Sequence, residues 1–138
     1  MTREEALKII DDNANVDDNS FLFYIHERNL FDNKAYWRFY NAIRVIGYDC
    51  CQSDCLSKEL TWKIIKTYEW FLLAIGWHFD NKDLYKMLNL PDNYMAFSLR
   101  LMTVVDSYIK GDTISDRLEE SLNEDLVNQF NIRLDREF

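Results

Sequence analysis

Turn-forming residues are scarce in this chain, because its 138 residues include only three glycines and one proline. Sheet-rich folds need frequent turn residues, so this scarcity argues against most β architectures and favours long helices joined by short polar loops. The length suits one domain, and 48% hydrophobic residues, with 15% aromatic, supply enough material for a core. We therefore expect an all-α fold, a compact single-domain bundle of about seven helices over residues 1–138.

Long hydrophobic runs are also missing. The longest candidate, Trp70–Trp77, has eight residues, well short of the roughly 20 that a membrane span requires. Met1–Ile10 is already charged and amphipathic, unlike a secretory leader. An odd number of cysteines, three, indicates reduced thiols. These features predict a soluble cytoplasmic protein that has no membrane partner.

Recognisable catalytic motifs are absent as well. Histidine occurs twice, and no common nucleotide-binding, metalloprotease or hydrolase motif is present. Cys50, Cys51 and Cys55 form a CC-x₃-C cluster that, with His78, would supply four zinc ligands. Structural zinc sites use two close pairs of ligands, whereas His78 is single and distant. We expect no metal, no cofactor and no enzymatic activity; an active site built from Asp and Glu alone is the alternative.

Helix boundaries are marked by capping residues. Thr2 followed by Glu5 is a capping-box pattern, and Asp11–Ser20 is a polar stretch expected to be a loop. Phe21–Ile25 is β-prone, but it has no alternating partner segment, so helix is favoured. Further start signals precede apolar residues at helical spacing: Ser20, Asp32, Ser57, Asp80 with Asp83, Asp92 or Asn93, and Ser115. Gly47 and Gly111 are the expected C-terminal stops, with a break over Tyr48–Asp54.

What the chain has in excess is acidic charge at its two ends. Residues 1–20 carry six acids and two bases, residues 112–138 carry eight acids and three bases, and the 91 residues between them hold ten acids and eleven bases. Such an asymmetry attracts a cationic partner and repels phosphate, so we expect a basic protein partner and no nucleic acid. The candidate contact residues are the acids of these two ends: Asp116, Glu119, Glu120, Glu124, Asp125, Asp11, Asp12, Asp17 and Asp18.

Four aromatic residues, Tyr36, Trp37, Phe39 and Tyr40, follow one another closely in an expected helix. At 100° per residue they cannot share one face, and Phe39 belongs to the apolar stripe. The others are either buried because a central helix packs on two sides, or exposed as an aromatic anchor for a protein interface. Tyr36, Trp37 and Tyr40 are therefore further candidate partner-binding residues.

In size, acidity and helical character, the whole chain resembles the helical immunity proteins of bacterial contact-dependent growth inhibition and related polymorphic-toxin systems. This resemblance rests on the overall profile and on no motif. It implies a small protein that binds one cognate toxin. Because nucleases hold phosphate on cationic surfaces, an acidic protein can cover such a site. We therefore expect an immunity protein that inhibits a cognate toxin nuclease by covering its substrate site.

Two other functions fit the same composition. One is a phage-type inhibitor of a nucleic-acid-binding defence complex, which would also bind through acidic charge. The other is a regulatory adaptor that holds a small apolar ligand between helices, lined by Met87, Met95 and Met102. Salt dependence separates these interpretations, because added salt slows charge-steered docking and hardly affects binding in an apolar pocket.

Overall fold

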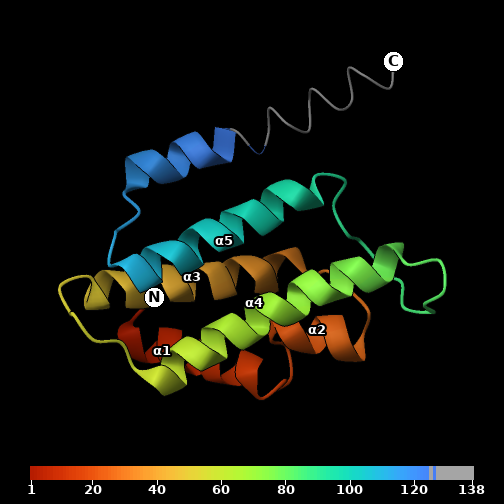
Figure 1. The fold of residues 1–138 in the computed structure, drawn as a ribbon, viewed down its shortest axis with the longest axis horizontal. Coiled ribbons are helices and arrows are strands. Elements are labelled where there is room, and N and C mark those ends of the chain that lie inside the picture. Colours follow the sequence, from red (N-terminus) through yellow and green to blue (C-terminus); the bar gives the residue numbers. More distant parts are fainter. Residues whose placement is uncertain (125, 127–138) are drawn as a thin grey trace.

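Six helices and no strand make up the part of the chain that the structure describes. The computed structural model describes residues 1–124 and 126. The all-α class is confirmed, and the expected number of seven helices is slightly too high. The helices are α1 (Arg3–Ala14), α2 (Phe21–Glu27), α3 (Asn33–Cys50), α4 (Lys58–Phe79) and α5 (Tyr94–Lys110), followed by a helix over 116–124 (Figure 1).

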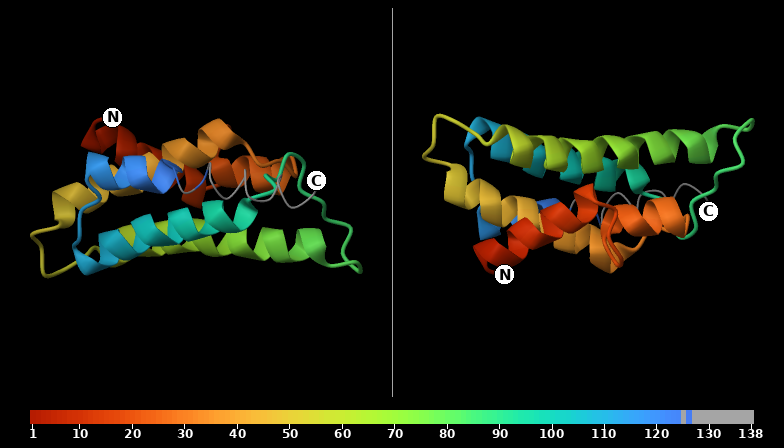
Figure 2. Two further views of the ribbon diagram at one scale, coloured as in Figure 1. Left: turned by 90° about the horizontal axis from the view of Figure 1, so that it is seen from above. Right: turned by 90° about the horizontal axis from the view of Figure 1, so that it is seen from below.

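The first five helices form two layers (Figure 2). One layer is the antiparallel pair α4 and α5, in which the Thr61 hydroxyl lies 3.0 Å from the Tyr108 hydroxyl. The other layer contains α1, α2 and α3. The 116–124 helix lies along the upper edge in Figure 1 and is bonded to both α3 and α5. Because α3 contacts α1, α5 and this last helix, it is the central element.

Most helix starts follow from hydrogen bonds between residues three apart. The Thr2 hydroxyl accepts a bond from the Glu5 N–H, and the Glu5 carboxylate accepts one from the Thr2 N–H at 2.7 Å, so the capping box is confirmed. Gly111 ends α5 with a left-handed φ of 78°, as expected. Side-chain caps also form at four other expected positions: Ser20, Asp32, Ser57 and Ser115.

Two predicted helix ends are wrong. The loop expected over Asp11–Ser20 is shorter, because α1 continues to Ala14 and therefore includes Asp11 and Asp12. Gly47 does not stop α3, which continues to Cys50. A Cβ added at Gly47 would lie 3.5 Å from the Cα of Tyr108, so the glycine lies where α5 approaches α3 closely.

The helix expected to begin at Asp80 with Asp83 does not form. Instead, the Asp80 and Asp83 carboxylates accept bonds from the N–H groups of Lys82 and Tyr85, two residues further on, which stabilises turns rather than a helix. The segment then pairs with residues 29–31, since the Leu88 N–H donates to the Asn29 carbonyl at 2.7 Å. Local turn bonds and this distant pairing together replace the helical bonds.

The core beneath α3 is aromatic. The ring of Phe21 meets the rings of Phe31, Tyr36 and Phe71 edge-on at centroid distances of 5.2–5.7 Å. Such edge-to-face pairs each contribute about 0.5–1.5 kcal/mol beyond the burial of their area. The cluster joins α2, α3 and α4, so it fixes how the two layers meet.

Two glycines provide a test of the helix ends. Gly111→Ala should lower the free energy of unfolding by about 1–2 kcal/mol, because its φ is positive and an added Cβ would lie 3.1 Å from the Cys51 carbonyl oxygen. Gly76→Ala should raise it by about 0.5–1 kcal/mol, since this position in α4 has nothing within 4 Å of an added Cβ. Urea unfolding followed by circular dichroism measures both changes. Equal effects of the two substitutions would contradict this account of Gly111.

Candidate docking surface

The 116–124 helix is attached to the body of the protein through Glu119. One oxygen of its carboxylate accepts a 2.5 Å bond from the Tyr40 hydroxyl, and the other accepts a bond from the guanidinium of Arg100. The Arg100 Nε also donates to the Tyr40 hydroxyl at 3.0 Å. Three helices, α3, α5 and the 116–124 helix, therefore meet at one ion pair, which we call the Glu119 network (Glu119, Arg100 and Tyr40).

Arg100 is 3% exposed, so its charge is held inside the protein. Its guanidinium lies over the rings of Trp37 and Tyr40, 5.3 and 5.1 Å from their centroids. Desolvation lowers the pKa of Arg100, but the bonds and charges of Tyr40 and Glu119 outweigh it and raise that pKa. Burying one partner of such a pair without the other is costly. Moving Glu119 away would leave the Arg100 charge buried without its carboxylate partner, so this ion pair stabilises the position of the 116–124 helix.

A second cation holds the beginning of the same helix. Arg44 of α3 donates to the Ile114 carbonyl at 2.8 and 3.1 Å and to the Asp116 carboxylate at 2.8 Å. Its Nε also lies 3.6 Å from a Glu119 carboxylate oxygen. Arg44 thus ties the segment before the helix, as well as its first turn, to α3.

With Glu119 turned inward, other acids of this helix face solvent. Asp116, Glu120 and Glu124 follow one another at intervals of four residues, which places them on one side of a helix. The Asp116 side chain is 97% exposed, and Glu120 and Glu124 are also exposed. Leu122, on the opposite side, is half-buried. We call these three exposed acids the acidic ridge.

Next to the ridge lies an open depression of about 620 Å³. Its lining includes Val45 and Tyr48 of α3, together with Ile114 and Asp116. Tyr48 is 70% exposed, so it presents an aromatic ring beside acidic charge. Sequence reasoning missed Tyr48 because it placed this residue in a break after Gly47. If the helix had been continued beyond Gly47, Tyr48 would have been placed on the same face as Arg44, which lies four residues earlier.

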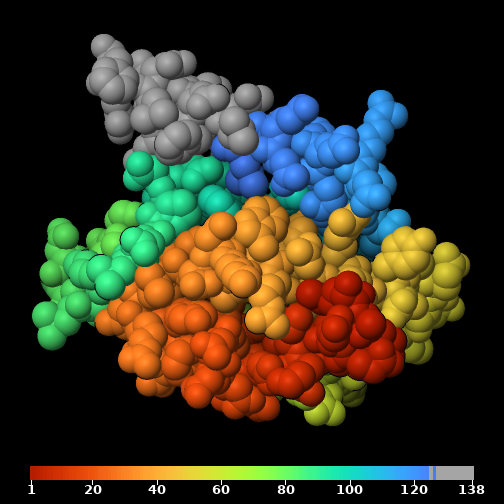
Figure 3. Space-filling view, turned by 180° about the vertical axis from the view of Figure 1, so that it is seen from behind, coloured from red at the N-terminus to blue at the C-terminus, as the bar shows by residue number. Residues whose placement is uncertain are grey.

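The candidate acids around the end of α1 (Asp11, Asp12, Asp17 and Asp18) do not join this surface. In Figure 1 the turn after α1 lies at the lower edge and the 116–124 helix at the upper edge, and Figure 3 shows α3 between them. Asp11 pairs with Lys63 at 2.6 Å, and Asp12 pairs with Lys8 at 2.7 Å. Four of the acids at the two ends therefore have cationic partners within the fold: Asp11, Asp12, Asp116 and Glu119.

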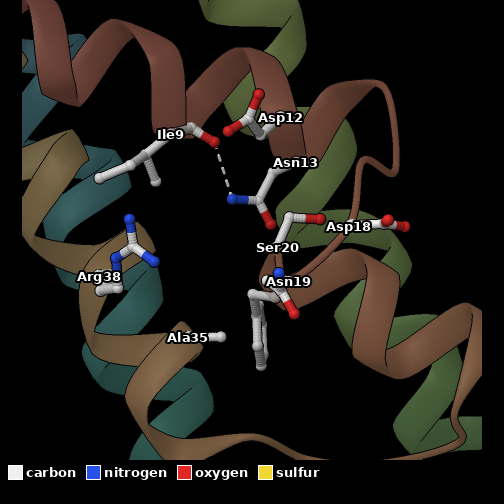
Figure 4. A pocket seen from close by; sticks show the side chains of 9 residues that line it. Ile9, Asp12, Asn13, Asp18, Asn19, Ser20, Ala35 and Arg38 are labelled. Atoms are coloured by element: carbon white, nitrogen blue, oxygen red, sulfur yellow. Dashed lines mark hydrogen bonds between the residues drawn. The ribbon is translucent and has the colours of Figure 1, made fainter.

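Asp17 and Asp18 remain exposed at that lower edge. Asp18 lines a small cavity together with Asp12 and Arg38. Figure 4 shows the Arg38 side chain, which comes from α3, on the opposite side of this cavity from the two acids. The cavity measures about 40 Å³, which is room for little more than water. Beside it, Asn13 donates to the Ile9 carbonyl and accepts from the Leu22 N–H, which joins α1 to α2.

The two tyrosine candidates on α3 are not a surface anchor. Tyr36 and Tyr40 are both 0% exposed, and the Tyr36 hydroxyl donates to the Phe97 carbonyl at 2.7 Å. Trp37 is half-buried against Tyr36, Tyr40 and Phe97. The alternative in which a central helix is buried on two sides therefore describes α3. Asp125, the remaining candidate, lies outside the described residues.

The features that suggested a ligand are dispersed. Cys50, Cys51 and Cys55 are free thiols near the end of α3. The imidazole Nδ1 of His78 accepts a bond from the Met87 N–H at 2.8 Å. Within residues 1–124 and 126, no three His, Cys, Asp or Glu side chains gather as a metal site.

The methionines proposed to line an apolar pocket face different ways. Met87 is 3% exposed and belongs to the core, whereas Met95 and Met102 are 59% and 39% exposed on the outside of α5. They therefore do not enclose one ligand between helices.

The geometry defines an all-α protein whose most distinctive surface is an acidic ridge beside an exposed tyrosine. No protein-family model matches this chain, and no curated protein or solved structure is similar enough to count as a match. None of the helices in the described part of the chain has the length and apolar character needed to cross a membrane.

Glu119 and Glu120 are adjacent acids whose roles should differ. Glu119→Ala should lower the free energy of unfolding by about 3 kcal/mol, because it leaves the Arg100 charge buried without its carboxylate partner. Glu120→Ala should change it by no more than about 0.5 kcal/mol, since that side chain is exposed. Urea unfolding at neutral pH measures both. A small loss for Glu119→Ala would contradict the role given to the Glu119 network.

Alkaline pH should weaken the same network. Burial raises the pKa of the Tyr40 hydroxyl from 10.0 to about 12. As the pH rises, Tyr40 therefore ionises in the unfolded chain before it ionises in the folded protein. The contribution of Tyr40 to the free energy of unfolding is complete below pH 10 and is lost as the pH rises towards 12. Tyr40→Phe should therefore make the free energy of unfolding fall less steeply over that range, as measured by urea unfolding at several pH values. An unchanged slope would show that Tyr40 ionises normally.

Proposed function

We propose that this protein binds and neutralises a basic protein partner, as an immunity protein that covers the substrate site of a cognate toxin nuclease. The observation that carries the proposal is the acidic ridge beside Tyr48. Exposed carboxylates steer a cationic partner during encounter and set the association rate. A tyrosine in a depression is a frequent hot-spot residue and slows dissociation once it is covered. The ridge and Tyr48 together supply both components.

The way the ridge is held also supports a docking role. The Glu119 network and Arg44 fix the 116–124 helix on both α3 and α5, so the carboxylates do not have to be ordered when a partner binds. Preorganisation of this kind reduces the entropic cost of association. A nuclease is the partner class favoured by charge, because its phosphate-binding surface is cationic.

The probe for this proposal is the product of the adjacent reading frame, which should be a toxin with a basic carboxy-terminal domain. Co-expression of this protein should prevent the growth arrest that the toxin causes. Changing Glu120 and Glu124 to Lys should slow association with the toxin several-fold and weaken the salt dependence of the association rate. Tyr48→Ala should weaken the binding free energy by about 2 kcal/mol or more, mainly through faster dissociation. Surface plasmon resonance at several salt concentrations measures both rates.

Asp17→Lys with Asp18→Lys is the matched control, because it makes the same change in net charge at the opposite edge of the molecule. It should leave the association rate nearly unchanged. If the control slows association and the ridge variant does not, the partner uses the amino-terminal acids and the ridge is only a solvated face. If the adjacent protein neither binds nor arrests growth, the immunity proposal fails.

A further inference from the structure

The helix α5 is apolar on two sides. Its inner side supplies buried core residues such as Leu101, Val104 and Tyr108. Its outer side carries a second stripe in which four large side chains are 39–59% exposed. These four residues are Met95, Leu99, Met102 and Ile109. Together with Asp106, which lies between Met102 and Ile109, they follow alternating steps of four and three residues, the spacing of a coiled-coil seam.

Neighbouring α4 extends this stripe into a face. Leu72 and Phe79 are 39% and 54% exposed, and the rings of Phe79 and Tyr94 lie 5.0 Å apart where α4 ends and α5 begins. Figures 1 and 2 show α4 and α5 side by side as an outer layer, with the other described helices behind or above them. We call these six exposed residues the α4/α5 face: Leu72, Phe79, Met95, Leu99, Met102 and Ile109.

The size of this face matches what a dimer needs. At roughly 100 Å² for each half-exposed side chain, the six residues offer on the order of 600 Å² of exposed apolar surface, close to the largest apolar patch of a typical monomer. With flanking groups, this area comes near the ~800 Å² that each partner buries in a standard interface. An apolar patch at the upper end of the range found on monomers is often functional. The α4/α5 face is therefore a candidate interaction surface, and its coiled-coil spacing suits an apolar helix.

We propose that the occupant is a second copy of this chain, bound through a twofold axis near Met102 with the two α5 helices antiparallel. The outer members of the stripe are symmetric about that residue, since Met95 and Ile109 each lie seven positions away. A twofold axis there would place Met95 of one copy against Ile109 of the other, which is the self-complementarity that a twofold interface requires.

Asp106 supports the antiparallel arrangement. In a parallel, in-register pair, the two Asp106 carboxylates would face each other in the seam, which like charges disfavour. In the antiparallel pair they lie on opposite sides of the axis, separated by about eight residues of helix, or roughly 12 Å along it. The dimer surface is formed by α4 and α5, whereas the acidic ridge belongs to the 116–124 helix, so the two surfaces are separate.

The mass in solution tests this proposal. Sedimentation equilibrium or light scattering coupled to gel filtration should give twice the 16.7 kDa mass of the chain. Changing Leu99 and Met102 to Glu should reduce the mass to that of one chain while the helical circular dichroism spectrum is kept. Leu84→Glu is the control for an exposed leucine changed to glutamate outside the face, because Leu84 is 99% exposed, and this variant should remain a dimer.

A disulfide tests the geometry independently. In a chain with Ser at positions 50, 51 and 55, Met102→Cys should form a cross-linked dimer under oxidised glutathione, because the twofold axis brings the two thiols together, and Leu84→Cys should not. A wild-type protein that stays monomeric at the highest soluble concentration overturns the proposal and assigns the face to another occupant. A dimer that survives both glutamates overturns it as well, because the copies then meet elsewhere.

Discussion

The ion pair between Arg100 and Glu119 is the constraint on which the candidate docking surface depends. A guanidinium buried on α5 is tolerated only when a carboxylate and further acceptors meet it. Glu119 meets it from the last helix, and Tyr40 bonds to both from α3. The position and rotation of the 116–124 helix therefore follow from one internal charge, and the rotation that turns Glu119 inward turns Asp116, Glu120 and Glu124 outward.

Net charge by itself is a poor guide to the surface of this protein. The formal charge is −8, yet Asp11, Asp12, Asp116 and Glu119 all have cationic partners in the fold. The exposed pairs of Asp11, Asp12 and Asp116 contribute little to stability, unlike the buried pair of Glu119, but all four pairs change the field that an approaching partner meets. The acids available for recognition are consequently fewer than the composition indicates, and they are divided between two edges of the molecule.

The central position of α3 explains both the aromatic core and the surplus of apolar surface elsewhere. Because α3 is covered by α1, α5 and the last helix, Tyr36 and Tyr40 lie in the interior with their hydroxyls bonded. Helix α5 covers α3 on one side only, and Met95, Leu99 and Met102 remain on its outer side. Apolar residues beyond those the core needs are typical of chains that associate.

The sequence alone determined the helical class and most helix starts, because Thr2, Ser20, Asp32, Ser57 and Ser115 each cap a backbone N–H three residues away, whatever the rest of the chain does. Only the tertiary structure decided the outcomes that depend on distant partners. The segment after Asp80 pairs with residues 29–31, α3 continues past Gly47 where α5 approaches it, and Glu119 bonds to Tyr40, 79 positions earlier in the chain. A hydrogen bond between near neighbours can be read from their spacing, whereas the choice between an exposed and an internal acid depends on which helix lies opposite.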